Sequence, residues 1–225
     1  MIRLHVTTEG ATERNFLNRV LAQHLAGFGV FVDARDVMTS RDKRRGQEYR
    51  GGLISYQRAR RDIENWIKQD GGQTCWFSTM FDLYGLPSDF PGVQASRTND
   101  PYERVAALEQ ALADDFGHPR FLPYIQLHEF EALLLADIQQ LDWEYLEHDQ
   151  QIENLAQMVG NGNPELINDG AQTAPSKRIL GEIPEFDKPT SGVIIAERIG
   201  LARLRERCPH FNNWVGQLEA LGEPS

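Results

Sequence analysis

The sequence is poor in cysteine and has no long apolar run. Its 225 residues contain two cysteines, Cys75 and Cys208, which fit neither a disulfide framework nor the spacing of a zinc site. No apolar stretch approaches the roughly 18 residues that a membrane span needs. The first residues, MIRLHVTTEG, lack the apolar region and cleavage site of a signal peptide. We therefore expect a cytoplasmic protein without a membrane span.

Several catalytic motifs are also missing. The chain has no GxxxxGK(S/T) loop, and GNGNPE (160–165) is a poor substitute for cradling a nucleotide phosphate. The stretch HEFEA (128–132) is not the HExxH of zinc peptidases, and no PCxxC of a zinc deaminase accompanies it. No GxSxG elbow occurs either. These absences argue against a nucleotide-binding loop, zinc catalysis and serine hydrolysis.

Charge is unevenly distributed along the chain. The formal net charge is −10, which by itself disfavours a polyanionic partner, since phosphate contacts dominate nucleic-acid affinity. Residues 41–61, however, have a local balance of +6, and residues 99–155 have a balance of −11. The basic segment is compatible with nucleic acid, and equally with a solvated loop and helix face.

Alternating strand and helix signals occupy the first half of the chain. Apolar and β-branched runs predict strands at 2–8, 30–39, 73–81 and 119–127. Helical spacing is found at 16–25, 53–69 and 102–112, and the polar stretch 40–52 is predicted to be a loop. From residue 128 onward the pattern is mainly helical, with breaks at 160–165, 173–177 and 182–192. Strands joined by helical crossovers predict an α/β fold with a parallel sheet and a helical C-terminal part.

Acidic residues follow several of the predicted strands. Glu9 comes after the first, Asp82 ends the third, and Glu129 and Glu131 follow the fourth. The carboxyl ends of parallel strands share one edge of a sheet, where ligands bind. Clustered carboxylates repel one another unless a cation neutralises them, and hard oxygen ligands favour magnesium or manganese. This pattern predicts a divalent-metal site.

Each of these acids also has a purely structural interpretation. Glu13 falls in the first turn of a helix with Thr12 as its expected N-cap, where the helix dipole favours a carboxylate by about 0.3–1 kcal/mol. Asp82 would begin a turn, and Glu129 and Glu131 would be first-turn acids of the next helix. The joint placement at three strand ends favours the metal-site interpretation.

Five stretches resemble a known prokaryotic family. They are VTTEGATERNFLNRVL, TMFDLYGLPSDFPG, LPYIQLHEFEALLLAD, TAPSKRIL and ERCPHFNNW, and they extend over nearly the whole chain. They are similar to domain-of-unknown-function family 4276, which looks TOPRIM-like and akin to the OLD (overcoming lysogenization defect) nucleases. The resemblance implies a TOPRIM-like α/β domain over 1–136, with a helical extension over 137–225 packed on it as one folding unit.

The same resemblance implies roles for individual residues. Glu9 would be the TOPRIM glutamate, Glu13 the second glutamate of OLD-type sites, and Asp82 the first aspartate of an Asp-x-Asp pair. Glu131, or alternatively Glu129, would serve a second metal ion. Lys177 would be the assisting lysine. The second aspartate is replaced by Tyr84, whose phenol titrates near ~10 and is a poor magnesium ligand.

The expected function is Mg²⁺- or Mn²⁺-dependent hydrolysis of DNA or RNA by an effector of anti-phage defence. Arg178 would join Lys177 in neutralising phosphate charge, and His128 is either a proton carrier or a structural residue. The nucleic-acid strand would be guided by Arg41, Lys43, Arg44 and Arg45. The alternative is a non-catalytic partner subunit of an ATPase encoded nearby. An oligomer is compatible with either hypothesis.

Overall fold

The main sheet is parallel. The computed structural model describes residues 1–42, 47–50, 53–95, 98–167 and 173–223, with the backbone alone for 38–42 and 47–50. Strands β1 (Ile2–Thr8), β2 (Val30–Asp36) and β5 (Cys75–Asp82) pair in the order β2-β1-β5. The short strands β6 (Phe121–Leu122) and β7 (Ile125–Gln126) pair with the other side of β5, also in parallel. The predicted α/β class is therefore confirmed.

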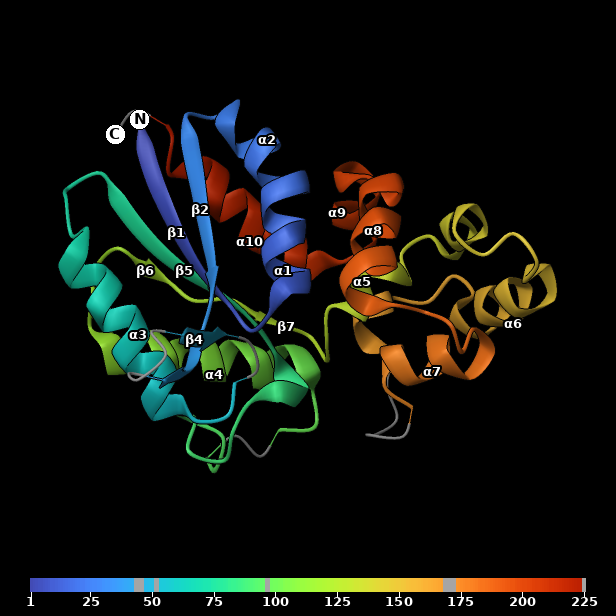
Figure 1. Cartoon of the computed structure of the whole chain (residues 1–225), viewed down its shortest axis with the longest axis horizontal. Helices are drawn as coiled ribbons and strands as arrows, with labels where there is room; N and C mark the ends of the chain where they lie inside the picture. Colours follow the sequence, from blue (N-terminus) through green and yellow to red (C-terminus); the bar gives the residue numbers. More distant parts are fainter. Residues whose placement is uncertain (43–46, 51–52, 96–97, 168–172, 224–225) are drawn as a thin grey trace.

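Helices cover both faces of this sheet (Figure 1). The connection from β1 to β2 runs through α1 (Ala11–Phe16), the π-helix η1 (Leu17–Leu21) and α2 (Ala22–Ala26). The other face is covered by α3 (Tyr56–Gln69) and α4 (Pro101–Phe116). Side chains alternate along β5, so Met80 joins the apolar cluster of α1 whereas Phe77 and Phe81 join that of α3 and α4. A parallel sheet buried on both faces is the arrangement that its apolar strands require.

The C-terminal part is helical and extends to one side of the sheet (Figure 1). None of the described helices is both long and apolar enough to cross a membrane. The segments in chain order are α5 (Glu131–Leu134), η3 (Ile138–Trp143), α6 (Asp149–Val159), η4 (Pro164–Leu166), α7 (Pro175–Glu182), η5 (Lys188–Gly192), α8 (Val193–Ile199), α9 (Leu201–Arg207) and α10 (Pro209–Ala220).

Helix α10 returns to the sheet and brings the C-terminal end of the chain close to its N-terminal end (Figure 1). The Trp214 ring stacks on Tyr124 with centroids 4.2 Å apart, and its indole N–H donates to the Ser78 hydroxyl at 3.1 Å. Phe211 and Leu204 are completely buried in the cluster that also contains Leu4 of β1. One apolar core therefore includes both the sheet and the C-terminal helices.

Two sequence-based predictions about strands were wrong. The stretch predicted as a loop over 40–52 contains an antiparallel pair, β3 (Met38–Asp42) with β4 (Gln47–Arg50). The strand predicted over 119–127 is divided into β6 and β7 by Pro123, which has no N–H for the ladder. At this break the Thr79 hydroxyl donates to the Tyr124 carbonyl and accepts from the Tyr124 N–H, both at 3.0 Å.

Three helix boundaries also differ from those predicted. The first helix has Gly10 as its N-cap, not Thr12, which is already in the first turn. The helix predicted over 53–69 begins at Tyr56, because Ser55 is extended. The expected break at 182–192 contains η5, which runs directly into α8. The stretch 182–192 is polar and contains proline, which predicts a loop, but tertiary packing makes part of it helical.

Candidate functional site

Glu9 and Glu13 stand where β1 passes into α1. Glu9 follows the last residue of β1, and its backbone N–H donates to the Met80 carbonyl of the neighbouring strand at 3.3 Å. Glu13 is 3% exposed, and its Oε2 accepts from the Gly10 N–H at 3.0 Å. That contact satisfies one of the unpaired N–H groups at the helix start. The second oxygen of Glu13 faces the site described below.

Asp82 ends β5 at the same edge of the sheet. Because β1 and β5 are paired in parallel, Thr8 lies opposite Met80 and both strands end side by side. The Asp82 N–H donates to Glu9 Oε2 at 3.3 Å, so the two acids are neighbours despite 73 residues of separation in the sequence. The Asp82 side chain is 9% exposed.

Glu131 reaches the same edge from β7. The β7 strand pairs with the end of β5, Gln126 opposite Asp82, and Glu131 begins α5 a few residues later. Its side chain is completely buried. Three chain segments therefore converge, each carrying a carboxylate to one point.

Lys188 lies among these carboxylates. Its ammonium nitrogen is 3.0 Å from Glu131 Oε2, 3.3 Å from Asp82 Oδ2 and 3.8 Å from Glu13 Oε1. Lys188 is the first residue of η5, which packs against α1 and α5. Lys188 was not among the residues predicted from the sequence. The lysine predicted to neutralise phosphate charge was Lys177, which lies exposed on α7.

The electrostatics of this group follow from burial. Burial raises the pKa of Glu9, Glu13 and Asp82, and for Glu131 it raises the pKa to about 7. The Lys188 ammonium lowers the pKa of all four carboxyls, which offsets part of the effect of burial. Burial disfavours the charged form of Lys188, but the surrounding carboxylates outweigh it and raise its pKa above the ordinary value. With every group ionised, four carboxylates and one ammonium carry a formal charge of −3.

The donor set suits a hard divalent cation. Among the described residues, Asp82 Oδ1 and Glu131 Oε1 are buried without any hydrogen-bond partner. Buried carboxylate oxygens without a partner carry a desolvation cost that a coordinated cation would offset. Oxygen ligands without histidine or thiolate are those that magnesium and manganese prefer. The carboxylates surround the ammonium, so Lys188 and a cation would share the acidic cluster.

A different ligand set lies elsewhere on the sheet. His5, Asp70 and Cys75 form the group of metal-ligating side chains, within the described part of the chain, whose ligand atoms all lie within 4.8 Å of one another. Asp70 is already engaged there, because its Oδ1 accepts from Arg3 at 2.6 Å and its Oδ2 lies 2.7 Å from His5 Nε2. Arg3, His5 and Asp70 therefore form an ion-paired network at the end of α3 that satisfies Asp70 without a metal ion.

Glu129 has a different partner. Its Oε1 accepts from the Ser176 N–H at 2.6 Å, at the start of α7, where the N-cap Ala174 has no side-chain acceptor. A carboxylate at this position also interacts favourably with the helix dipole. Of the two acids that the sequence analysis proposed for a second metal ion, only Glu131 faces Lys188.

Tyr84 and His128 connect the loops after β5 and β7. The Tyr84 N–H donates to the His128 carbonyl at 3.0 Å, and their ring centroids are 5.3 Å apart. His128 has φ of 63°, the one non-glycine residue with positive φ in the described chain. Burial lowers the pKa of His128 and raises that of Tyr84, so a neutral imidazole and a protonated phenol are favoured. Tyr84 therefore does not replace the missing aspartate as an anionic ligand.

Of the remaining predicted residues, Arg178 is the one whose side chain the structure describes. Arg178 donates its Nε–H to the Thr173 carbonyl at 2.7 Å, next to the start of α7. Arg41 lies in β3, where the backbone alone is described. Lys43, Arg44 and Arg45 fall outside the described residues.

Comparison with known proteins gives a family match. A family model described as a domain of unknown function, DUF4276, matches residues 8–219. No curated protein matches the sequence.

Solved structures of two bacterial proteins are similar over nearly all of the chain. The C-terminal region of the Burkholderia pseudomallei OLD protein has 17% identity and a TM-score of 0.46, with 99% of this chain and 100% of that chain covered. The C-terminal region of the Xanthomonas campestris pv. campestris OLD protein has 15% identity and a TM-score of 0.44, with 99% and 98% covered.

Proposed function

The chain belongs to the DUF4276 family, and we propose that it is a divalent-metal-dependent nuclease that hydrolyses phosphodiester bonds. One observation carries the proposal: carboxylates from three separate segments, Glu13, Asp82 and Glu131, surround the buried ammonium of Lys188. This cluster lies at the carboxyl ends of parallel strands, where α/β sheets bind ligands. The resemblance of the sequence to TOPRIM-like nucleases agrees with this chemistry.

The acidic residues would hold the metal ion. Glu9, Glu13, Asp82 and Glu131 supply oxygen donors and a net negative charge, and magnesium or manganese would suit them. When bound, such an ion polarises a phosphoryl group and lowers the pKa of a bound water. A single ion is the simplest expectation, because Tyr84 stands where the second TOPRIM aspartate would be and Glu129 is engaged with α7.

Lys188 would stabilise negative charge on the substrate. The Lys188 ammonium would neutralise negative charge that develops on the phosphate oxygens, which is worth most in a site screened from water. Burial raises the pKa of Glu131 to about 7 in the metal-free chain, and a bound divalent ion would lower this pKa and keep the carboxylate ionised as a ligand. In this assignment Lys188 takes the role that the sequence analysis gave to Lys177.

Several finer expectations stay predictions. They are the guidance of a strand by Arg41, Lys43, Arg44 and Arg45, the contribution of Arg178, the division of the chain near residue 136, the cytoplasmic location, and a role in anti-phage defence beside an ATPase. The substrate is proposed as nucleic acid, either DNA or RNA.

A cleavage assay tests the proposal directly. The purified chain is incubated with plasmid DNA, single-stranded DNA and RNA in Mg²⁺, in Mn²⁺ and in EDTA. We expect cleavage with a divalent ion and none in EDTA, and none from the Glu9→Gln, Asp82→Asn double variant. Divalent ions should also raise the melting temperature of the wild type but not of the double variant. Ion-dependent stabilisation without cleavage of any substrate would favour the non-catalytic partner of an ATPase instead.

Gly85 gives a milder test of the Glu9 position. A Cβ at Gly85 would lie 2.6 Å from Glu9 Oε1, closer than van der Waals contact allows. In Gly85→Ala the flexible Glu9 carboxylate has to move, so we expect little change in the metal-free melting temperature. The stabilisation by Mg²⁺ should fall markedly.

Gly181→Ala is the matched control for this variant, since a Cβ at Gly181 meets no atom within 4 Å. It should bind Mg²⁺ like the wild type. An unchanged Mg²⁺ response in Gly85→Ala would remove Glu9 from the set of ligands.

A further inference from the structure

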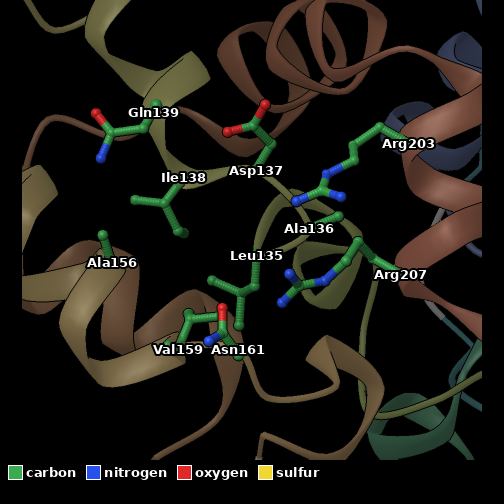
Figure 2. A pocket seen from close by; sticks show the side chains of 11 residues that line it. Leu135, Ala136, Asp137, Ile138, Gln139, Ala156, Val159, Asn161, Arg203 and Arg207 are labelled. Carbon is green, nitrogen blue, oxygen red and sulfur yellow. The ribbon is translucent and has the colours of Figure 1, made fainter.

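A cavity of about 190 Å³ lies in the helical part of the chain, between α6, α9 and the segment 135–139 (Figure 2). None of the carboxylates around Lys188 lines it. Leu135, which contributes to its wall, follows Glu131 by one helical turn. The cavity is therefore close to the acidic cluster along the chain, but separate from it.

Two arginines enter this cavity from the same helix. Arg203 and Arg207 are four residues apart on α9, and Figure 2 shows both guanidinium groups pointing into the hollow. Like charges at this spacing repel each other by about 0.2–0.5 kcal/mol on an exposed helix. An anion between them would remove that repulsion.

Both guanidinium groups keep hydrogen-bonding capacity for a ligand. Arg203 Nη1 pairs with Glu206 at 2.7 Å, but these side chains are 39% and 67% exposed, and such a pair is weak. Arg207 Nη2 donates to the Gly162 carbonyl at 2.6 Å. Each guanidinium has five N–H donors, and these contacts with described residues use few of them.

The rest of the wall carries one charged residue. Asp137 is the one acid among the residues that line the cavity, and it accepts a hydrogen bond from the Gln140 amide at 3.1 Å. Asn161 adds a carboxamide beside Gly162, whose carbonyl accepts from Arg207, and Leu135 and Ala156 supply apolar surface (Figure 2). The lining carries a formal charge of +1 in a chain whose net charge is −10.

We propose that this cavity binds a phosphate group. Paired guanidinium groups match phosphate oxygens in a planar, two-point geometry that lysine cannot offer. The volume is below the roughly 300 Å³ of small pockets for drug-sized ligands, which suits a phosphate and part of the group that carries it. The phosphate belongs either to a small molecule or to the end of a nucleic-acid strand. This inference does not depend on the nuclease activity.

Calorimetric titration of the full chain tests the site and separates the two sources. The titrations are made in EDTA at constant ionic strength, so that no divalent ion bridges the ligand to the acidic cluster. The probes are inorganic phosphate, a nucleoside monophosphate, and a short oligonucleotide with either a 5′-phosphate or a 5′-hydroxyl. Binding of phosphate and of the mononucleotide indicates a small-molecule site. Binding of the 5′-phosphorylated oligonucleotide alone indicates a strand end.

Arginine variants decide whether the cavity is responsible. The double variant Arg203→Gln, Arg207→Gln should bind at least tenfold more weakly to any phosphate probe that the wild type binds. Arg19→Gln is the matched control, because Arg19 is also half exposed and paired with one glutamate, Glu197, outside the cavity. Arg203→Glu alone, which leaves the Arg207 contact intact, replaces the double variant if that protein does not fold. Absence of binding by every phosphate probe, or equal binding by the arginine variants, would overturn the proposal.

Discussion

Asp82→Asn is expected to lower phosphodiester cleavage at least about 10³-fold, corresponding to about 4 kcal/mol of transition-state stabilisation. The amide keeps the shape of the side chain but removes the negative charge that a divalent ion needs at the end of β5. The variant should nevertheless be as stable as the wild type in EDTA, or more stable. Burial raises the pKa of Asp82 well above its usual range, so its ionised form is costly to the fold. Lys188 keeps Glu131 and Glu13 as partners.

Activity and stability have to be measured on the same preparation of this variant. Initial cleavage rates in Mg²⁺ give the first, and thermal melting in EDTA gives the second. Asp142→Asn is the control, since Asp142 is an exposed acid outside the cluster and its loss should change neither quantity. Cleavage by Asp82→Asn at the wild-type rate would refute the assignment of Asp82 to the metal site, however stable the protein was.

Lys188→Met is expected to destabilise the metal-free chain by about 2 kcal/mol at pH 8 and to abolish cleavage. Removing one partner of a fully buried ion pair costs about 3–5 kcal/mol. The smaller figure applies here because 34% of the Lys188 side chain is exposed and solvent screens part of the interaction. Mg²⁺ should restore most of the lost stability, since the ion replaces the missing positive charge among the carboxylates.

The loss of stability in Lys188→Met should depend on pH. The pKa of Glu131 in the folded chain is raised to about 7, above its usual 4.5. The stability that protonated Glu131 contributes is complete below the usual pKa and is lost as the pH rises through about 7. The Glu131 carboxyl is largely protonated near pH 5 and is stabilised less by the ammonium there. The difference between variant and wild type should therefore be small at pH 5 and grow toward pH 8.

Lys177→Met is the matched control for this experiment. Both substitutions remove one lysine charge, but Lys177 is exposed on α7 and makes no ion pair with the acidic cluster among the described residues. Chemical denaturation in EDTA between pH 5 and pH 8 compares the stabilities, and the cleavage assay compares the activities. Loss of cleavage in Lys177→Met with normal cleavage in Lys188→Met would show that Lys177, as predicted from the sequence, is the lysine that neutralises phosphate charge.

The placement of Glu9 and Asp82 at one edge of the sheet was predictable from local sequence patterns. The strand β1 is a short apolar run and β5 is rich in aromatic and β-favouring residues, and Glu9 and Asp82 come directly at their ends. Parallel strands joined by helices finish on the same side, so acids at their ends must approach one another. The hydrogen bond from the Asp82 N–H to Glu9 reflects this register. No long-range information was needed beyond the order of strands and helices.

The different roles of Glu129 and Glu131 were not predictable from their sequence positions. They are two residues apart and equally acidic, and each was a reasonable ligand. In the fold Glu129 accepts the Ser176 N–H and stabilises the start of α7, whereas Glu131 is buried against Lys188. The choice depends on where α7 and η5 pack, and the residues that contact the two acids, Ser176 and Lys188, lie 47 and 57 residues further along the chain.

The sequence by itself determined the α/β class, the family and the meeting of Glu9 and Asp82 at one edge of a parallel sheet, because hydrophobic periodicity and strand-end position are local properties of the chain. Only the tertiary structure decided which lysine enters the acidic cluster. Lys177 and Lys188 have the same chemistry and similar surroundings in the sequence, since each lies within two residues of a proline in a mainly helical region. They differ because η5, which carries Lys188, packs against α1 and α5 and so places Lys188 among the carboxylates. No short stretch of sequence encodes this packing.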